Sequence, residues 1–226
     1  MKLLRIGEKG KEKPAIVDNQ NNYKDLSSII EDFNPKTLNF ETLEKVKNTD
    51  LSKLPTIDSN ERIGACVSEP SKFIGIGLNF KDHAEEQNLP IPKEPIIFSK
   101  FTSCITGPND PIVVPKGSNH TDWEVEIGFV IGKKAINVSV ENAIDHVLGF
   151  FLVNDVSERD FQKNRGLTWD KGKGFDTFGP IGPFIVTTDE LPNYQNLDMF
   201  LDVNGKRMQT GNTSKMIFDI KTLVSY

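Results

Sequence analysis

The chain has 226 residues, of which 37% are apolar and 26% are charged, and its formal net charge is −5. This composition is typical of a globular protein with one sizeable core, and the negative charge argues against nonspecific nucleic-acid binding. No apolar stretch is long enough to predict a membrane-spanning helix, and the charged N-terminus does not resemble a secretory signal. We therefore expect a cytoplasmic protein in which Cys66 and Cys104 are free thiols.

Residues 1–62 predict a small N-terminal α/β subdomain. KLLRI and PAIVD predict two short strands that flank the turn-like GEKGKEK. SSIIEDF (27–33) predicts a helix capped by Asp25 or Ser27, and NFETLEKVKN (39–48) predicts a second helix capped by Asn39.

Residues 63–226 are rich in strand patterns and predict the main domain. Asn204-Gly205 indicates a two-residue hairpin turn. Many short strands with occasional helices predict an α+β fold with a mixed, antiparallel-rich sheet. The predicted strands lie at 72–77, 94–101, 111–115, 123–132, 146–155, 182–187 and 199–208, and the predicted helices at 79–88, 139–147, 157–164 and 216–226.

The segment TDWEVEIGFVIG (121–132) places Asp122, Glu124 and Glu126 on one face of a strand that continues into an apolar run. A solvated strand face is the simplest interpretation. A glycosidase pair of carboxylates is a second, although few aromatic side chains accompany it. The third is a site for a hard divalent cation, because carboxylates without nearby His or Cys suit Mg²⁺, Mn²⁺ or Ca²⁺.

The segment FLVNDVSERDFQ (151–162) predicts a buried strand that ends at Asp155, followed by a polar helix. Asp155 could supply a third metal ligand from the end of this strand. Alternatively, Asp155 or Ser157 could cap the helix, which this stretch alone favours.

His83 and Glu86 lie three residues apart in LNFKDHAEEQN, so a helix would place them on one face. A carboxylate beside an imidazole suits a general base. In the alternative, Asp82 and Glu85 form a capping box and His83 is a surface residue. The lysines of WDKGKGFDTF could clamp a substrate anion or lie in a solvated loop.

Taken together, five ordered segments resemble the fumarylacetoacetate hydrolase family. They are FIGIGLNFKDHAEE, PIIFSKFTSCITGPNDPIVVP, DWEVEIGFVIGK, NDVSERDFQ and KGKGFDTFGPIGPFIV. The likeness spans residue 70 to the end, and residues 1–62 look like the small leading domain of bacterial members. MKLLRIGEKGKEKPAIVD, PIPKEP and DVNGKRMQTGNTSKMIF are similar to the subgroup that hydrolyses 2,4-diketo-3-deoxy-L-rhamnonate or L-fuconate, whose relatives are often labelled ureidoglycolate lyase.

This resemblance implies a β-roll fold and a role for each matching residue. Glu124, Glu126 and Asp155 would hold Mg²⁺ or Mn²⁺, and Lys173 would stabilise developing negative charge, with Lys171 as the alternative in a shifted register. His83 and Glu86 would position and deprotonate a water, and Gln162 would contact the substrate. Asp122 would support Lys173 or a water on the metal.

The implied activity is hydrolysis of a carbon–carbon bond in a 2,4-diketo acid, with release of pyruvate, by a homodimer that needs no nucleic acid or membrane. A hydratase, isomerase or decarboxylase on the same site is an alternative. The family continues past the last helix into strands and a substrate loop, whereas this chain ends at KTLVSY. We therefore expect a C-terminally incomplete catalytic domain at 63–226, and a non-catalytic metal-binding paralogue or an inactive fragment is the alternative from another class.

Overall fold

The computed structural model describes residues 1–166 and 168–226. The strands are β1 Lys2–Ile6, β2 Lys13–Val17, β3 Tyr23–Asp25, β4 Thr56–Ile57, β5 Phe73–Gly77, β6 Ile96–Lys100, β7 Ile105–Thr106, β8 Thr121–Asp122, β9 Val125–Ile131, β10 Val147–Asn154, β11 Ser157–Glu158, β12 Gly179–Thr187, β13 Asp198–Val203 and β14 Lys206–Asn212. The α-helices are α1 Phe40–Lys47, α2 Lys81–Glu86, α3 Arg159–Lys163, α4 Asp170–Lys173 and α5 Ile220–Ser225.

The largest sheet has the strand order β4-β3-β2-β1-β12-β10-β9, with β7 as a further partner of β12. The β7–β12 pair is parallel and the other pairs in this sheet are antiparallel. The hairpins β5–β6 and β13–β14 and the short pair β8–β11 form three smaller sheets. The predicted α+β fold class with an antiparallel-rich sheet is confirmed.

The N-terminal strands continue the main sheet instead of forming a separate one. Strand β1 hydrogen-bonds with β12, so that Leu3 lies opposite Ile185. Both side chains are fully buried in the principal hydrophobic core, which also contains Phe33 and Leu148. Residues from both sides of the predicted boundary at 62/63 therefore share one core.

Two local predictions are confirmed in detail. Helix α1 begins after Asn39, whose side chain accepts a hydrogen bond from Thr42 N at 2.8 Å. The hairpin β13–β14 turns at Asn204 and Gly205, which have φ angles of 51° and 76°. These positive values are those of a type I′ turn, whose twist matches the flanking strands.

Other predicted elements are wrong. Residues 27–33 form turns instead of a helix, residues 111–115 form no strand, and the helical part of 139–147 is a 3-10 helix, Ala143–His146. The cap of α3 is Glu158, whose carboxylate accepts from Phe161 N at 2.8 Å, and neither Asp155 nor Ser157 has this role.

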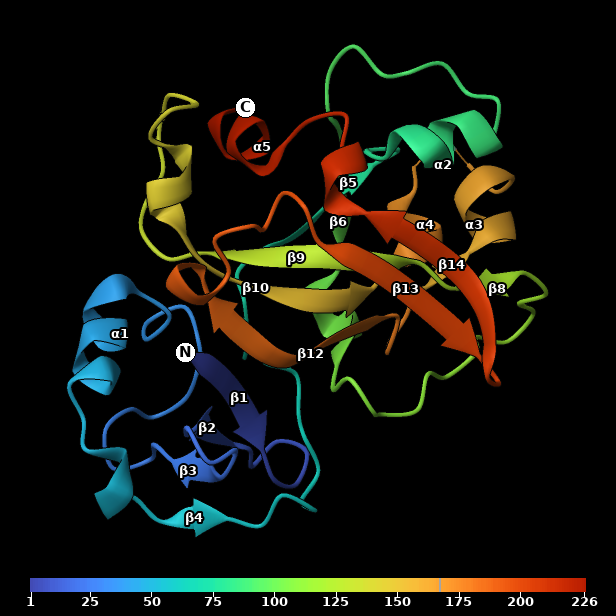
Figure 1. Cartoon of the computed structure of the whole chain (residues 1–226). Coiled ribbons are helices and arrows are strands. Elements are labelled where there is room, and N and C mark those ends of the chain that lie inside the picture. The colour runs from blue at the N-terminus through green and yellow to red at the C-terminus, as the bar shows by residue number, and fades with distance from the viewer. Residues whose placement is uncertain (167) are drawn as a thin grey trace.

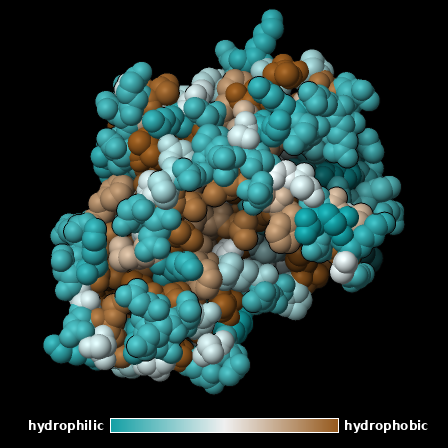
Figure 2. All heavy atoms as spheres, in the orientation of Figure 1, coloured by the Kyte–Doolittle hydropathy of each residue, from teal (hydrophilic) through white to brown (hydrophobic). Residues whose placement is uncertain are grey.

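Figure 1 shows α2, α3 and α4 gathered on one side of the molecule, away from α1 and β1–β4. The β13–β14 hairpin packs across β9. Figure 2 shows that apolar side chains remain exposed in the middle of this face, between the N-terminal elements and the rest of the chain.

Among the described residues, no helix is long and apolar enough to cross a membrane. The buried polar side chains near α3 and α4 identify this region as the candidate functional site.

Candidate functional site

Glu124 lies in a break between β8 and β9, so the three predicted carboxylates do not lie on one continuous strand. Asp122 ends β8 and Glu126 lies within β9. At the break, the side-chain oxygen of Asn154 accepts from Glu124 N at 3.1 Å, and Glu124 O accepts from Asp155 N at 2.8 Å. These bonds replace the regular ladder and hold Glu124 beside Asp155.

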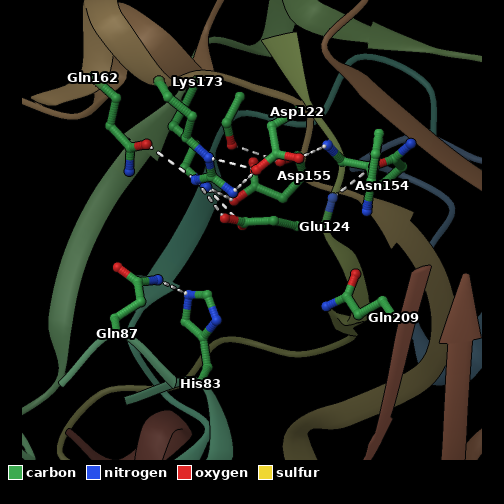
Figure 3. A network of polar contacts seen from close by, with 12 residues as sticks. His83, Gln87, Asp122, Glu124, Asn154, Asp155, Gln162, Lys173 and Gln209 are labelled. Carbon is green, nitrogen blue, oxygen red and sulfur yellow. Dashed lines mark hydrogen bonds and ion pairs between the residues drawn. The ribbon is translucent and has the colours of Figure 1, made fainter. Parts of the chain in front are cut away.

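Lys173 joins the two predicted metal segments. It ends the short helix α4, and its side chain is buried. Its ammonium lies 2.7 Å from Glu124 Oε2 and 2.7 Å from Asp155 Oδ2 (Figure 3). The predicted register is thereby favoured over Lys171, which is exposed and donates to the main-chain oxygen of Arg165.

Lys100, at the end of β6, is a second buried cation that the sequence patterns did not identify. Its ammonium lies 2.6 Å from Asp155 Oδ1 and donates to the main-chain oxygen of Lys173 at 2.5 Å. Burial acts to raise the pKa of Asp155, and the charges of Lys173 and Lys100 outweigh that effect and lower it. Asp155 is therefore a carboxylate held ionised between two lysines.

Arg159 connects the remaining acids and was also missed. Its guanidinium lies 2.7 Å from Glu124 Oε1 and 2.7 Å from Asp122 Oδ2, and donates to Gln162 Oε1 at 3.1 Å. Asp122 therefore contacts Arg159, whereas the expectation was a supporting role toward Lys173 or a water on the metal. The buried Gln162 is oriented toward the same group.

Among the described residues, Glu126 is the predicted metal ligand that pairs with no cation. Within the described residues, its carboxyl group has no hydrogen bond or ion pair. Loss of hydration raises its pKa well above the usual value, and the charges of Glu124 and Asp155 raise it further, against the opposing effect of Lys173. Additional positive charge beside Glu126 would be stabilising.

His83 lies on α2 and faces the same network from the side on which Glu124 lies (Figure 3). Its Nε2 is 2.6 Å from Gln87 Nε2, while its Nδ1 is 3.9 Å from Glu86 Oε2. The Glu86 side chain is 82% exposed, so water weakens this pair. The alternative capping box is absent, because the cap of α2 is Phe80 and it makes no side-chain bond.

The donor set of Glu124, Glu126 and Asp155 fits a hard divalent cation in kind, since all its atoms are carboxylate oxygens. Within the described part of the chain, however, no three His, Cys, Asp or Glu side chains are arranged to hold a metal. Lys173 lies between Glu124 and Asp155 in this arrangement. The unpartnered Glu126 supports the fit, and a metal would require Lys173 to release a carboxylate.

Comparison with known proteins gives consistent matches. A family model described as the C-terminal part of fumarylacetoacetate (FAA) hydrolase matches residues 72–226. A protein of Burkholderia orbicola, provisionally named a hydrolase, is 53% identical over all of this chain and 80% of its own length.

Two solved structures have the same fold. A 5-carboxymethyl-2-hydroxymuconate delta-isomerase of Mycobacterium smegmatis is 30% identical with a TM-score of 0.77, over all of this chain and 80% of its own. A maleylpyruvate hydrolase of Sphingobium sp. SYK-6, solved with manganese(II) and pyruvate, is 26% identical with a TM-score of 0.81, over all of this chain and 81% of its own.

Proposed function

Because the chain belongs to the fumarylacetoacetate hydrolase family, we propose that it hydrolyses a carbon–carbon bond in a 2,4-diketo acid and releases pyruvate. The observation that supports this most is the buried ammonium of Lys173, held at 2.7 Å from both Glu124 and Asp155. A fixed cation in a site with little water is suited to stabilising an oxyanion. We further propose a 2,4-diketo-3-deoxy sugar acid as the substrate.

In this proposal Glu124, Glu126 and Asp155 would hold Mg²⁺ or Mn²⁺, which supplies Lewis-acid polarisation of the substrate's 2-keto and carboxylate oxygens. The maleylpyruvate hydrolase that was solved with manganese(II) and pyruvate supports this choice of ion and product class. The remaining chemistry is assigned to side chains of this chain.

His83 would take a proton from water as the water oxygen bonds to the C4 carbonyl carbon of the substrate. Glu86 would orient its imidazole through Nδ1, and Gln87, whose side-chain nitrogen lies 2.6 Å from Nε2, would release Nε2 to accept the proton. The C3–C4 bond then breaks, and its electron pair forms the enolate of pyruvate, whose oxygen Lys173 would stabilise. A proton added at C3 completes pyruvate, while C4 leaves as the carboxylic acid of the other product. Gln162 would contact the substrate from α3.

An isomerase of a keto dicarboxylic acid is the second candidate. The solved isomerase with 30% identity favours it. Isomerisation needs the same stabilised enolate but moves a proton between carbons without adding water. The two functions therefore differ in whether His83 activates water, and they are separated by the products.

The test is product analysis on a panel of 2,4-diketo acids with Mg²⁺, Mn²⁺ or a chelator. We expect pyruvate to appear with metal and to disappear with chelator. Glu124→Gln removes one charge at nearly constant volume and is expected to lower the rate by at least about a hundredfold. Glu141→Gln on the surface is the matched control. Metal-independent release, or full activity of Glu124→Gln, would contradict the metal assignment, and a rearranged product without pyruvate would favour the isomerase.

A further inference from the structure

Strand β5 carries two glycines whose missing side chains make room for aromatic rings. Gly75 and Gly77 are two residues apart and share one face of the strand. A β-carbon on Gly75 would lie 2.2 Å from Phe98 Cζ, and one on Gly77 would lie 1.9 Å from Trp169 Cζ3. Both distances are far shorter than any real contact. The glycines therefore allow the two rings to lie directly on the strand.

The two rings contact each other and approach Lys173. Phe98 projects from β6 opposite Gly75, and its ring centroid lies 5.7 Å from that of Trp169. Trp169 O accepts a hydrogen bond from Lys173 N at 3.1 Å. The Lys173 ammonium lies over the Phe98 ring, 5.3 Å from its centroid. This is within the range of a cation–π interaction, which strengthens when the cation is removed from water.

The Phe98 ring contacts a side of the Lys173 ammonium that the two carboxylates do not contact. A lysine side chain has four flexible bonds, so two ion pairs alone do not restrict it to one conformation. We infer that Phe98, seated against Gly75 and braced by Trp169, is a positioning residue that holds the Lys173 ammonium between Glu124 and Asp155. The negative face of the ring attracts the cation, and its bulk excludes water from that side.

A merely space-filling role for Phe98 makes a different prediction. Phe98→Leu keeps an apolar side chain but removes the π face, whereas Phe98→Tyr keeps the face. If the ring only fills space, both variants leave Lys173 in place. If the ring positions the ammonium, Phe98→Leu allows the Lys173 side chain to move, and Phe98→Tyr keeps it in place.

The direct test is NMR of the full chain labelled with ¹³C-lysine. The Cε methylene of Lys173 is identified by its absence from Lys173→Met, and its ¹³C relaxation order parameter is expected to be that of a restricted side chain. Phe98→Leu should lower this order parameter and Phe98→Tyr should keep it. Gly75→Ala should also lower it, because the new β-carbon displaces the ring. Gly211→Ala is the matched strand control, since nothing lies within 4 Å of a β-carbon there. An unchanged Lys173 order parameter in Phe98→Leu would overturn the inference.

The kinetic arm rests on the proposed function. With Mn²⁺ and a 2,4-diketo acid, Phe98→Leu is expected to lower kcat by roughly tenfold while KM changes little. Phe98→Tyr should recover most of kcat. An active wild type with an equally active Phe98→Leu would count against positioning. If the wild type releases no pyruvate but Phe98→Leu lowers the Lys173 order parameter and Phe98→Tyr keeps it, the proposed function fails and the positioning role stands.

Discussion

Lys100 donates to the main-chain oxygen of Lys173 at 2.5 Å while its ammonium also lies 2.6 Å from Asp155. Lys100 thus holds both the backbone of Lys173 and the carboxylate of Asp155. Lys173 contacts the same carboxylate. The two cations and Asp155 form one unit. Removing any member leaves a buried polar group without its partner, which is costly.

Lys100→Met is expected to destabilise the protein by roughly 2–3 kcal/mol at pH 7, because Asp155 and the carbonyl of Lys173 each lose a donor. Urea unfolding followed by circular dichroism measures this. Lys171→Met, a variant of the exposed neighbouring lysine, is the control and should unfold at the wild-type midpoint. Equal midpoints for both variants would show that the Lys100 contacts contribute nothing to stability.

Lys173→Met is expected to bind Mn²⁺ more tightly than the wild type, by roughly tenfold or more, although it should not turn over substrate. The reason is that Lys173 and a metal compete for Glu124 and Asp155. Electron paramagnetic resonance of free Mn²⁺ gives the Kd without any assay of activity. Lys171→Met should bind as the wild type does, and weaker binding by Lys173→Met would mean that Lys173 does not compete.

Asp110 and Arg62 make a two-pronged ion pair, with Nε–Oδ1 and Nη2–Oδ2 distances of 2.7 and 2.6 Å. Thr106 and Gly107 also donate to Asp110. The bond from Arg62, ahead of the opposing effect of burial, holds the pKa of Asp110 well below its usual range. A carboxyl with a lowered folded-state pKa stabilises the fold above its unfolded pKa, and this stability is lost as the pH falls.

Asp110→Asn should therefore reduce the free energy of unfolding by about 2 kcal/mol at pH 7, with a gap to wild type that narrows progressively below about pH 4. Urea titrations from pH 7 to pH 2 measure the gap. Asp50→Asn, on an exposed pair with Lys53, should show little change. A gap that stays constant over this pH range would contradict the role assigned to the Asp110 charge.

Asn39→Ala should destabilise the fold by about 1 kcal/mol, because Thr42 N loses the side-chain acceptor that caps the start of α1. Asn39→Asp should be nearly neutral, since a carboxylate also caps and complements the helix dipole. Thermal unfolding compares the three proteins. A loss in Asn39→Asp equal to that in Asn39→Ala would indicate that the position matters for a reason other than capping.

Elements whose signals are local were predictable from the sequence. The cap at Asn39 and the Asn204-Gly205 turn depend on a few adjacent residues, and both form as expected. The helix predicted at 27–33 failed despite suitable spacing of apolar residues. Leu26, Ile30 and Phe33 are indeed buried, but Pro35 disfavours helical backbone at Asn34, and turns bury the same side chains.

The candidate site shows the same difference between residues with a local sequence signal and residues identified only by distant contacts. Glu124, Asp155 and Lys173 were found from motifs and do come together. Lys100 and Arg159 were missed, because the carboxylates that they contact lie far away in the sequence. The signal available was a lysine in the apolar segment IIFSKF, whose burial no periodicity could establish. The break at Glu124 depends on Asn154 and was equally hidden.

The close fit of Gly75 against Phe98 has a consequence for how this chain can vary. A β-carbon at position 75 collides with the ring only while an aromatic residue stands at position 98. The effects of Gly75→Ala and Phe98→Leu should therefore be strongly non-additive, with the double variant less impaired than the sum of the two losses. In a combinatorial library, an allele with alanine at 75 should survive selection mainly together with a smaller residue at 98.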